Sequence, residues 1–242
     1  MAELLPEVVR ALQVSQSPNA PSSVRQEALA FIEGVKQSSQ QGFAVLHMVL
    51  QSGEEWPVKQ MALGLLNDWL RLWWNRLEDS NRDLIKGVLG QLLLDDALGC
   101  SPHRPLRTKL SVCIANVAER QFPQLWPSFL EEMLRVWQTS PLGRQDVVIS
   151  TFETMIVDCV DTDFNSSLPS TRRQEIIAGF KLQLEPLLST AFASLTDNLV
   201  KYQQFAPGSA ERTAVLDVAC ATLKLVRAFV QHTAARPLAW SS

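Results

Sequence analysis

The chain has 242 residues, of which 46% are hydrophobic and 19% charged, and its formal net charge at pH 7 is −3. This composition excludes a disordered chain, because enough apolar surface is available to build a sizeable core. Basic residues are scattered, which argues against autonomous nucleic-acid binding. No apolar run approaches the roughly 18 residues of a membrane-spanning helix, so we expect no membrane partner.

Helical periodicity runs through the chain, and only 10 glycines interrupt it. Apolar residues recur at i, i+3, i+4 and i+7 in about ten segments separated by short polar breaks. In chain order the segments are 3–16, 22–38, 42–51, 56–75, 80–98, 104–121, 127–139, 141–161, 170–204 and 210–235. Prolines and small polar residues fill the breaks, as is typical of helix ends. The sequence therefore predicts an all-α protein whose helices follow one another in pairs.

The segment 56–75 is apolar on two sides. Its main stripe consists of Val58, Met61, Ala62, Leu65, Leu66, Trp69 and Trp73, and its second stripe of Leu63, Leu70 and Trp74. An apolar surface wider than about 100° cannot be buried against a single layer. We therefore expect this helix to lie between several neighbours.

The last two segments carry two further predictions. Pro186 lies inside the segment 170–204, and a helix-interior proline removes one hydrogen bond, so we expect a kink near residues 182–186. The chain ends soon after its last predicted helix without a polar capping segment. A solenoid that stops in this way leaves an apolar face open, so we expect a piece of a longer protein.

Pairs of helices recur about every 45 residues, and each pair has more apolar surface than it can bury alone. This period is typical of HEAT repeats, which span about 40 to 47 residues. The pattern predicts an α-solenoid, a superhelix of antiparallel helix pairs with about five repeats. Because the repeats share no sharp consensus, a compact helical bundle remains the alternative.

Catalytic and metal chemistry has few candidates in this sequence. The three histidines are far apart, and no glycine-rich phosphate loop or nucleophile elbow is present. Residues 161–165 place acidic and amide groups as a calcium loop does, but Ser166 and Arg172 stand where glycine and glutamate are needed. We therefore predict no catalytic residue, no cofactor and no metal site, and interpret the chain as a binding protein rather than an enzyme.

Two stretches resemble a known family. The string RQFPQLWPSFL at 120–130 is similar to the motif that joins two early repeats in importin-β-type transport receptors, the karyopherins. In it, Pro123 ends one helix, Pro127 starts the next, and Trp126 fills the corner between repeats. The string VKQMALGLLN at 58–67 resembles the importin-β N-terminal domain. The strings at 168–173 and 198–204 resemble the exportin-5 branch of the family.

The resemblance implies a nuclear export receptor that shuttles between nucleus and cytoplasm. Residues 1–135 would be importin-β-like N-terminal repeats that bind Ran-GTP, and residues 136–242 would be the following exportin-type HEAT repeats. The family's second helices face its partners, and the candidate Ran contacts on them are Lys59, Leu63, Asn67, Arg107, Lys109 and Asn116. The other implied partners are nucleoporins and a cargo of structured small RNA, such as a double-stranded microRNA-precursor hairpin or transfer RNA, or of protein.

Two alternatives remain at this point. An import receptor of the same superfamily would share the Ran contacts, and the strings at 168–173 and 198–204 are what favour export. A Ran-independent HEAT scaffold would keep the periodicity but would not need the corner at Trp126 and Pro127.

Overall fold

The structure, a computed structural model, describes residues 4–160 and 168–234. Every regular element in these residues is a helix. The first half contains α1 (Leu4–Gln16), α2 (Ser22–Gln37), α3 (Ser39–Gln51), α4 (Trp56–Trp73), η1 (Trp74–Arg76), α5 (Asp79–Leu94) and α6 (Arg104–Gln121). The second half contains α7 (Phe129–Thr139), α8 (Leu142–Val160), α9 (Ser170–Leu182), α10 (Leu184–Gln204) and α11 (Ala210–Ala234). The predicted all-α class is confirmed.

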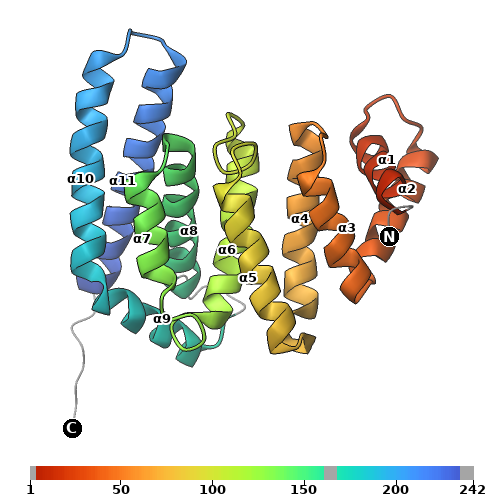
Figure 1. Cartoon of the computed structure of the whole chain (residues 1–242), viewed down its shortest axis with the longest axis horizontal. Helices are drawn as coiled ribbons and strands as arrows, with labels where there is room; N and C mark the ends of the chain where they lie inside the picture. Colours follow the sequence, from red (N-terminus) through yellow and green to blue (C-terminus); the bar gives the residue numbers. More distant parts are fainter. Residues whose placement is uncertain (1–3, 161–167, 235–242) are drawn as a thin grey trace.

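The helices stand in a row of pairs, with α1 and α2 at one end and α10 and α11 at the other (Figure 1). Within the row, α4 packs on α6, α6 on α8 and α8 on α11, so the second helices of successive pairs form one continuous stack. Contacts between neighbours, rather than around one shared centre, are the mark of a solenoid. The predicted HEAT-type architecture is confirmed, and the compact bundle is not what the chain forms.

Several predicted helix ends were wrong by a few residues. Helix α5 ends at Leu94 rather than residue 98, because the Asp95 carboxylate accepts the backbone N–H of Ala97 at 2.8 Å and starts a turn. The predicted kink is a complete break at Gln183, with φ −110° and ψ 16°, between α9 and α10. Pro186 thereby falls in the first turn of α10, where its missing N–H is not needed.

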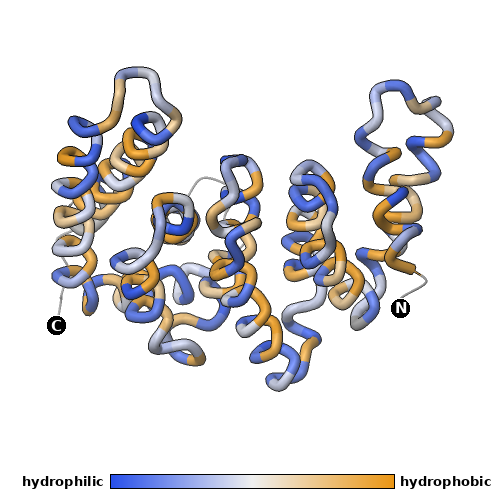
Figure 2. Tube along the Cα trace, turned by 45° about the horizontal axis from the view of Figure 1, so that its top comes forward, coloured by the Kyte–Doolittle hydropathy of each residue, from blue (hydrophilic) through white to orange (hydrophobic). Residues whose placement is uncertain are grey.

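Helix α4 lies between neighbours, as its two apolar stripes predict. Leu63 and Leu70 are fully buried and Trp74 is 3% exposed, because α6 covers the side of α4 that faces away from α3. Figure 2 shows apolar stretches along each helix pair, alternating with hydrophilic ones. Each pair therefore has one side to bury and one to keep in water.

An aromatic cluster closes the second half of the core. Phe152 of α8 lies 6.2 Å from Phe129 of α7 and 5.9 Å from Phe180 of α9, measured between ring centroids. Phe180 in turn lies 5.4 Å from Phe229 of α11. Edge-to-face aromatic pairs add to the burial of their apolar area, so four helices are held at one point.

The crossing of α2, α3 and α4 requires a glycine. A Cβ on Gly42 would lie 2.6 Å from the carbonyl oxygen of Val35 and 3.0 Å from the Trp69 ring. The Trp69 indole N–H donates to the carbonyl oxygen of Ser38 at 3.0 Å, which holds the ring against this turn.

We expect Gly42→Ala to destabilise the protein by about 1 to 3 kcal/mol, because the added methyl forces α3 away from α2 and Trp69. The matched control is Gly64→Ala in α4, where no atom lies within 4 Å of the added Cβ. That variant should gain up to about 1 kcal/mol from helix propensity. Urea unfolding of both variants measures the difference, and equal stabilities would contradict the predicted crossing.

Candidate partner-binding surface

The stack of α4, α6, α8 and α11, here called the second-helix layer, carries all six residues that the sequence singles out as partner contacts. These residues are Lys59, Leu63, Asn67, Arg107, Lys109 and Asn116. The structure distributes them between the interior of the layer and its surface.

Leu63 and Lys59 lie inside the layer. Leu63 is 0% exposed and Lys59 is 9% exposed. The Leu63 carbonyl oxygen accepts a hydrogen bond from the Cys113 thiol of α6 at 3.3 Å. Leu63 belongs to the second apolar stripe of α4, which α6 covers as that stripe predicts, whereas the burial of the charged Lys59 is not indicated by the periodicity. Their role as partner contacts stays a prediction. Burial also raises the pKa of the Cys113 thiol to about 12, so this cysteine stays protonated.

Asn67 and Asn116 join the same two helices. The Asn116 side-chain N–H₂ donates to Asn67 Oδ1 at 2.8 Å, and Asn116 is 5% exposed while Asn67 is half-buried. Arg120 donates to the Asn116 carbonyl oxygen at 2.7 Å and also to its side-chain oxygen. A buried amide needs such partners, so Asn116 sets the register of α6 against α4.

Arg107 is bound within the protein. Its Nε donates to Asp146 of α8 at 2.8 Å, and its Nη1 donates to the carbonyl oxygen of Ser101 at 2.5 Å. The side chains of Arg107 and Asp146 are 11% and 3% exposed, so the ion pair lies between two repeats. Lys109, two residues further along α6, is exposed. Of the six candidates, Lys109 offers the most accessible charge.

The corner between α6 and α7 is built around Phe122 as well as Trp126. Trp126 is half-buried, packs edge-on against Phe129 at 4.9 Å and carries Lys86 of α5 over its ring at 5.7 Å. Phe122 is 2% exposed and lies 5.8 Å from Phe180.

Both prolines of the predicted corner lie in the turn between α6 and α7. Pro123 is half-buried and follows the end of α6 at Gln121. Pro127 is exposed and does not start α7, which begins two residues later at Phe129. The Ser128 hydroxyl lies 2.5 Å from Glu132 Oε1 in the first turn of α7. The predicted start at residue 127 was therefore wrong by two residues, since the first helical bond of α7 runs from the Glu132 N–H to the carbonyl oxygen of Ser128 at 2.9 Å.

A buried carboxyl group that the sequence does not point to lies at the end of α6. Glu119 is 5% exposed, and burial, followed by the neighbouring Asp158 of α8, raises its pKa to about 8. Arg120 and Arg71 of α4 lower this pKa by smaller amounts. Glu119 Oε1 has no hydrogen-bond partner among the described residues. At neutral pH the Glu119 carboxyl group is therefore protonated and shares a hydrogen bond with Asp158.

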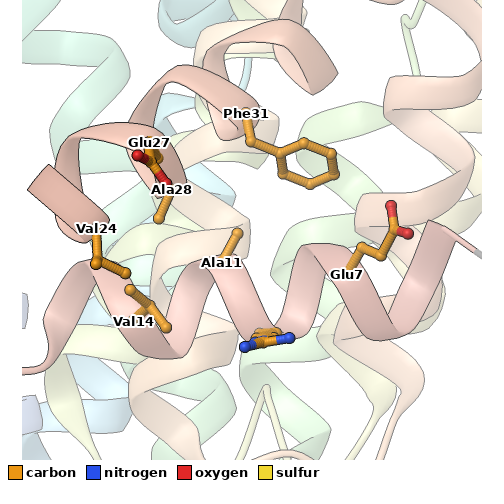
Figure 3. A pocket seen from close by; sticks show the side chains of 8 residues that line it. Glu7, Ala11, Val14, Val24, Glu27, Ala28 and Phe31 are labelled. Atoms are coloured by element: carbon orange, nitrogen blue, oxygen red, sulfur yellow. The ribbon is translucent and has the colours of Figure 1, made fainter. Parts of the chain in front are cut away.

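Two apolar hollows lie between helices of the first repeats. One, of about 320 Å³, lies between α1 and α2, where Ala11 and Val14 of α1 face Phe31 of α2 and where Glu7 and Glu27 come from opposite helices (Figure 3). The other, of about 540 Å³, is lined by residues of α3, α4 and α5 that include Phe43, Trp69 and Leu84.

Metal clusters and membrane-spanning helices are both absent from the described ranges. Residues 4–160 and 168–234 contain no group of three or more histidine, cysteine, aspartate or glutamate side chains that could hold a metal ion. No helix within them is long and apolar enough to cross a membrane. The calcium-loop-like string at 161–165 lies outside the described residues.

Stacked helix pairs that pack on their neighbours define the class of helical-repeat proteins. The family described as exportin 1-like protein matches residues 103–238, which is more than half of the chain. The chain belongs to the exportin 1-like protein family, and the resemblance drawn from its motifs is confirmed.

Several curated relatives carry exportin names. Exportin-5 of Dictyostelium discoideum is 23% identical over 205 residues, which cover 84% of this chain and 18% of the relative. Exportin-5 of Mus musculus is 23% identical over 94% of this chain and 19% of its own length. Exportin-T of Danio rerio is 27% identical over 88% of this chain and 21% of its own length. The chain thus spans about a fifth of the length of the relatives it matches.

The Arg107–Asp146 pair should be essential for stability. We expect Arg107→Met to cost about 3 to 5 kcal/mol, because it leaves Asp146 buried without its counter-charge. The control is Arg135→Met, which breaks a pair with Glu131 whose side chains are 67% and 75% exposed and should cost less than about 1 kcal/mol. Chemical denaturation measures both variants. A loss for Arg107→Met no larger than for the control would contradict a structural role.

Glu119 should make stability depend on pH. Its pKa rises from the ordinary 4.5 to about 8 on folding, so the folded protein must hold a proton that the unfolded chain releases. Stability from this group is complete below about pH 4.5 and is lost as pH rises toward about 8. Glu119→Gln keeps a donor for Asp158 and removes the titration.

We expect Glu119→Gln to match the unmodified protein at pH 5 and to exceed it by on the order of 3 kcal/mol at pH 9. Urea unfolding across this pH range tests the expectation. Asp83→Asn, at a carboxyl group that is 70% exposed, serves as the control. Parallel pH profiles of the Glu119→Gln variant and the unmodified chain would contradict the raised pKa.

Proposed function

We propose that this chain is the N-terminal, Ran-GTP-binding part of a nuclear export receptor that shuttles between nucleus and cytoplasm. Membership of the exportin 1-like protein family and the exportin names of its relatives support this function. The strongest structural support for this function is the second-helix layer, in which α4 packs on α6 and α6 packs on α8. Such a layer presents side chains from several repeats to one partner.

Ran-GTP meets this layer at Lys109 and the half-buried Asn67, the two candidates with accessible side chains. Leu63, Arg107 and Asn116 contribute indirectly, because their contacts hold α4, α6 and α8 in register. Lys59 is 9% exposed and belongs with this second group. A surface built across packed helices keeps its shape only while those contacts persist.

The receptor works by coupling rather than by covalent chemistry. Ran-GTP and cargo bind cooperatively, and each raises the affinity for the other by the same factor. The cargo is a structured small RNA, such as a double-stranded hairpin, or a protein. Nucleoporins are the partners during passage through the nuclear pore. Hydrolysis of GTP on Ran then releases Ran and the cargo from the receptor.

The alternatives predict different couplings. In an import receptor of this superfamily, Ran-GTP lowers the affinity for cargo instead of raising it. A Ran-independent HEAT scaffold binds neither nucleotide form of Ran. The sign of the effect of Ran-GTP on hairpin RNA binding, measured with the complete receptor that contains this chain, separates all three.

The Ran surface can be tested at Lys109. We expect the chain to bind Ran loaded with a non-hydrolysable GTP analogue in a calorimetric titration and to bind Ran-GDP much more weakly. Lys109→Glu should lower the affinity about tenfold, because a charged contact at an interface is reversed. Arg135→Glu on the exposed face of α7 makes the same change of charge outside the layer and should bind normally.

Circular dichroism and thermal unfolding establish that each variant is folded. Unchanged affinity of a folded Lys109→Glu variant removes this residue from the interface. Failure of the folded chain and of the complete receptor to bind Ran-GTP in the presence of hairpin RNA overturns the proposed function.

A further inference from the structure

Three arginines from three helices line one cavity beside the second-helix layer. The cavity, of about 520 Å³, lies where η1, α5, the end of α6 and the start of α9 meet. Its charged lining is Arg82, Arg120 and Arg172, together with the single carboxyl group of Glu119. We call this cavity the arginine pocket.

Two of the three arginines donate most of their hydrogen bonds to neutral oxygen atoms. Arg172 donates from Nε to the carbonyl oxygen of Glu119 at 2.8 Å and from Nη2 to that of Phe122. Arg120 donates to the backbone and side-chain oxygens of Asn116. These bonds fix the guanidinium groups but leave their net charge uncompensated.

Two of the carboxylates beside the pocket are exposed to water. Arg82 pairs with Asp79, whose side chain is 89% exposed, and Arg172 pairs with Glu175, whose side chain is 46% exposed. Solvent screens such pairs, so they offset little of the positive charge. Glu119 is protonated at neutral pH and shares a hydrogen bond with the half-buried Asp158 of α8, so these two groups together bring about one negative charge. Against three arginines, the pocket keeps a net positive charge.

The remaining walls combine the polar Asn75 and Gln121 with apolar side chains. They include Trp74, Leu125 and Leu168, and the volume exceeds that of an inorganic anion. The pocket therefore has room for an anionic group together with the carbon skeleton that carries it.

We propose that the arginine pocket binds a phosphate monoester group attached to a small apolar or aliphatic moiety. Guanidinium groups match the planar, multidentate geometry of phosphate oxygens, and charge-assisted bonds of this kind are about twice as strong as neutral ones. A monoester dianion offers three terminal oxygens and carries close to two charges at neutral pH. Three arginines therefore match a phosphate dianion better than they match a carboxylate, because one guanidinium group can already saturate a carboxylate.

The form of the site favours a monoester over a nucleic-acid backbone. A phosphodiester chain carries one charge per nucleotide and is bound along an extended positive groove. Here three arginines line one hollow, so the cations surround a point instead of following a line. None of the six candidate Ran residues lines the pocket, although Arg120 of the pocket donates a hydrogen bond to one of them, Asn116.

Isothermal titration of the 242-residue chain with phenyl phosphate, at constant ionic strength and pH 7, tests the proposal. We expect saturable one-to-one binding, with Arg120→Gln and Arg82→Gln each lowering the affinity about tenfold or more. Both glutamines retain hydrogen-bonding capacity, and Arg172 is left intact because its bonds hold the corner at Phe122. Arg135→Gln on α7 is the matched control and should bind normally.

Three further probes identify the source of the phosphate. Inorganic phosphate that binds as well as phenyl phosphate supports a free-phosphate ligand. A short phosphoserine peptide that binds more tightly supports a phosphorylated side chain of a partner protein. Dimethyl phosphate should bind at least about tenfold more weakly, because it carries a single charge and two blocked oxygens.

Two results overturn the proposal. One is a failure to locate binding at the pocket. Either a chain that circular dichroism shows to be folded does not bind phenyl phosphate saturably, or it binds with an affinity that both arginine substitutions leave unchanged. The other is binding of dimethyl phosphate or an RNA duplex that equals phenyl phosphate and depends on the same arginines, which would make the pocket a nucleic-acid contact.

Discussion

Burial of α6 on both sides is the constraint on which the rest of the structure depends. Helix α4 covers one side and α8 the other, so α6 has buried residues around most of its circumference, polar Ser111, Asn116 and Gln121 among them. Burying polar groups is favourable only when each finds a partner. Ser111 donates to Thr108 within α6 and Gln121 accepts from Lys86 of α5, whereas Asn116 and Arg107 have their partners in the repeats on either side, Asn67 and Asp146. The spacing of three helix pairs therefore depends in part on this hydrogen bond and this ion pair of α6.

This constraint explains which of the candidate partner contacts remain accessible on the surface. Polar side chains of α4 and α6 that a helix projection assigns to the surface are used between the repeats, as Asn116 with Asn67 and Arg107 with Asp146 illustrate. What remains accessible lies along the edges of the layer, such as Lys109, and in hollows where three repeats meet, such as the arginine pocket. The candidate partner contacts and the contacts between repeats therefore lie on the same helices.

The corner after α6 links these two roles. Phe122 enters the aromatic cluster of the following repeats, while the Arg172 guanidinium reaches back from α9 to the carbonyl oxygens of Glu119 and Phe122. A Cβ on Gly179 would lie 2.5 Å from the Phe122 ring, so the contact of α9 with this corner requires a glycine. The predicted domain boundary between residues 135 and 136, which stays a prediction, falls inside α7, directly beyond this corner.

The sequence alone determined the helical class, the pairing of helices and the family, because apolar periodicity and the strings at 58–67 and 120–130 are local features. It also revealed that α4 has two buried sides, since both stripes can be counted along one helix. Only the tertiary structure decided which polar residues are free. Arg107 and Asn116 are bound by residues of other helices, 39 positions away for Asp146 and 49 positions away for Asn67. The raised pKa of Glu119 and the meeting of Arg82, Arg120 and Arg172 likewise arise where distant repeats stack, and no local pattern encodes that contact.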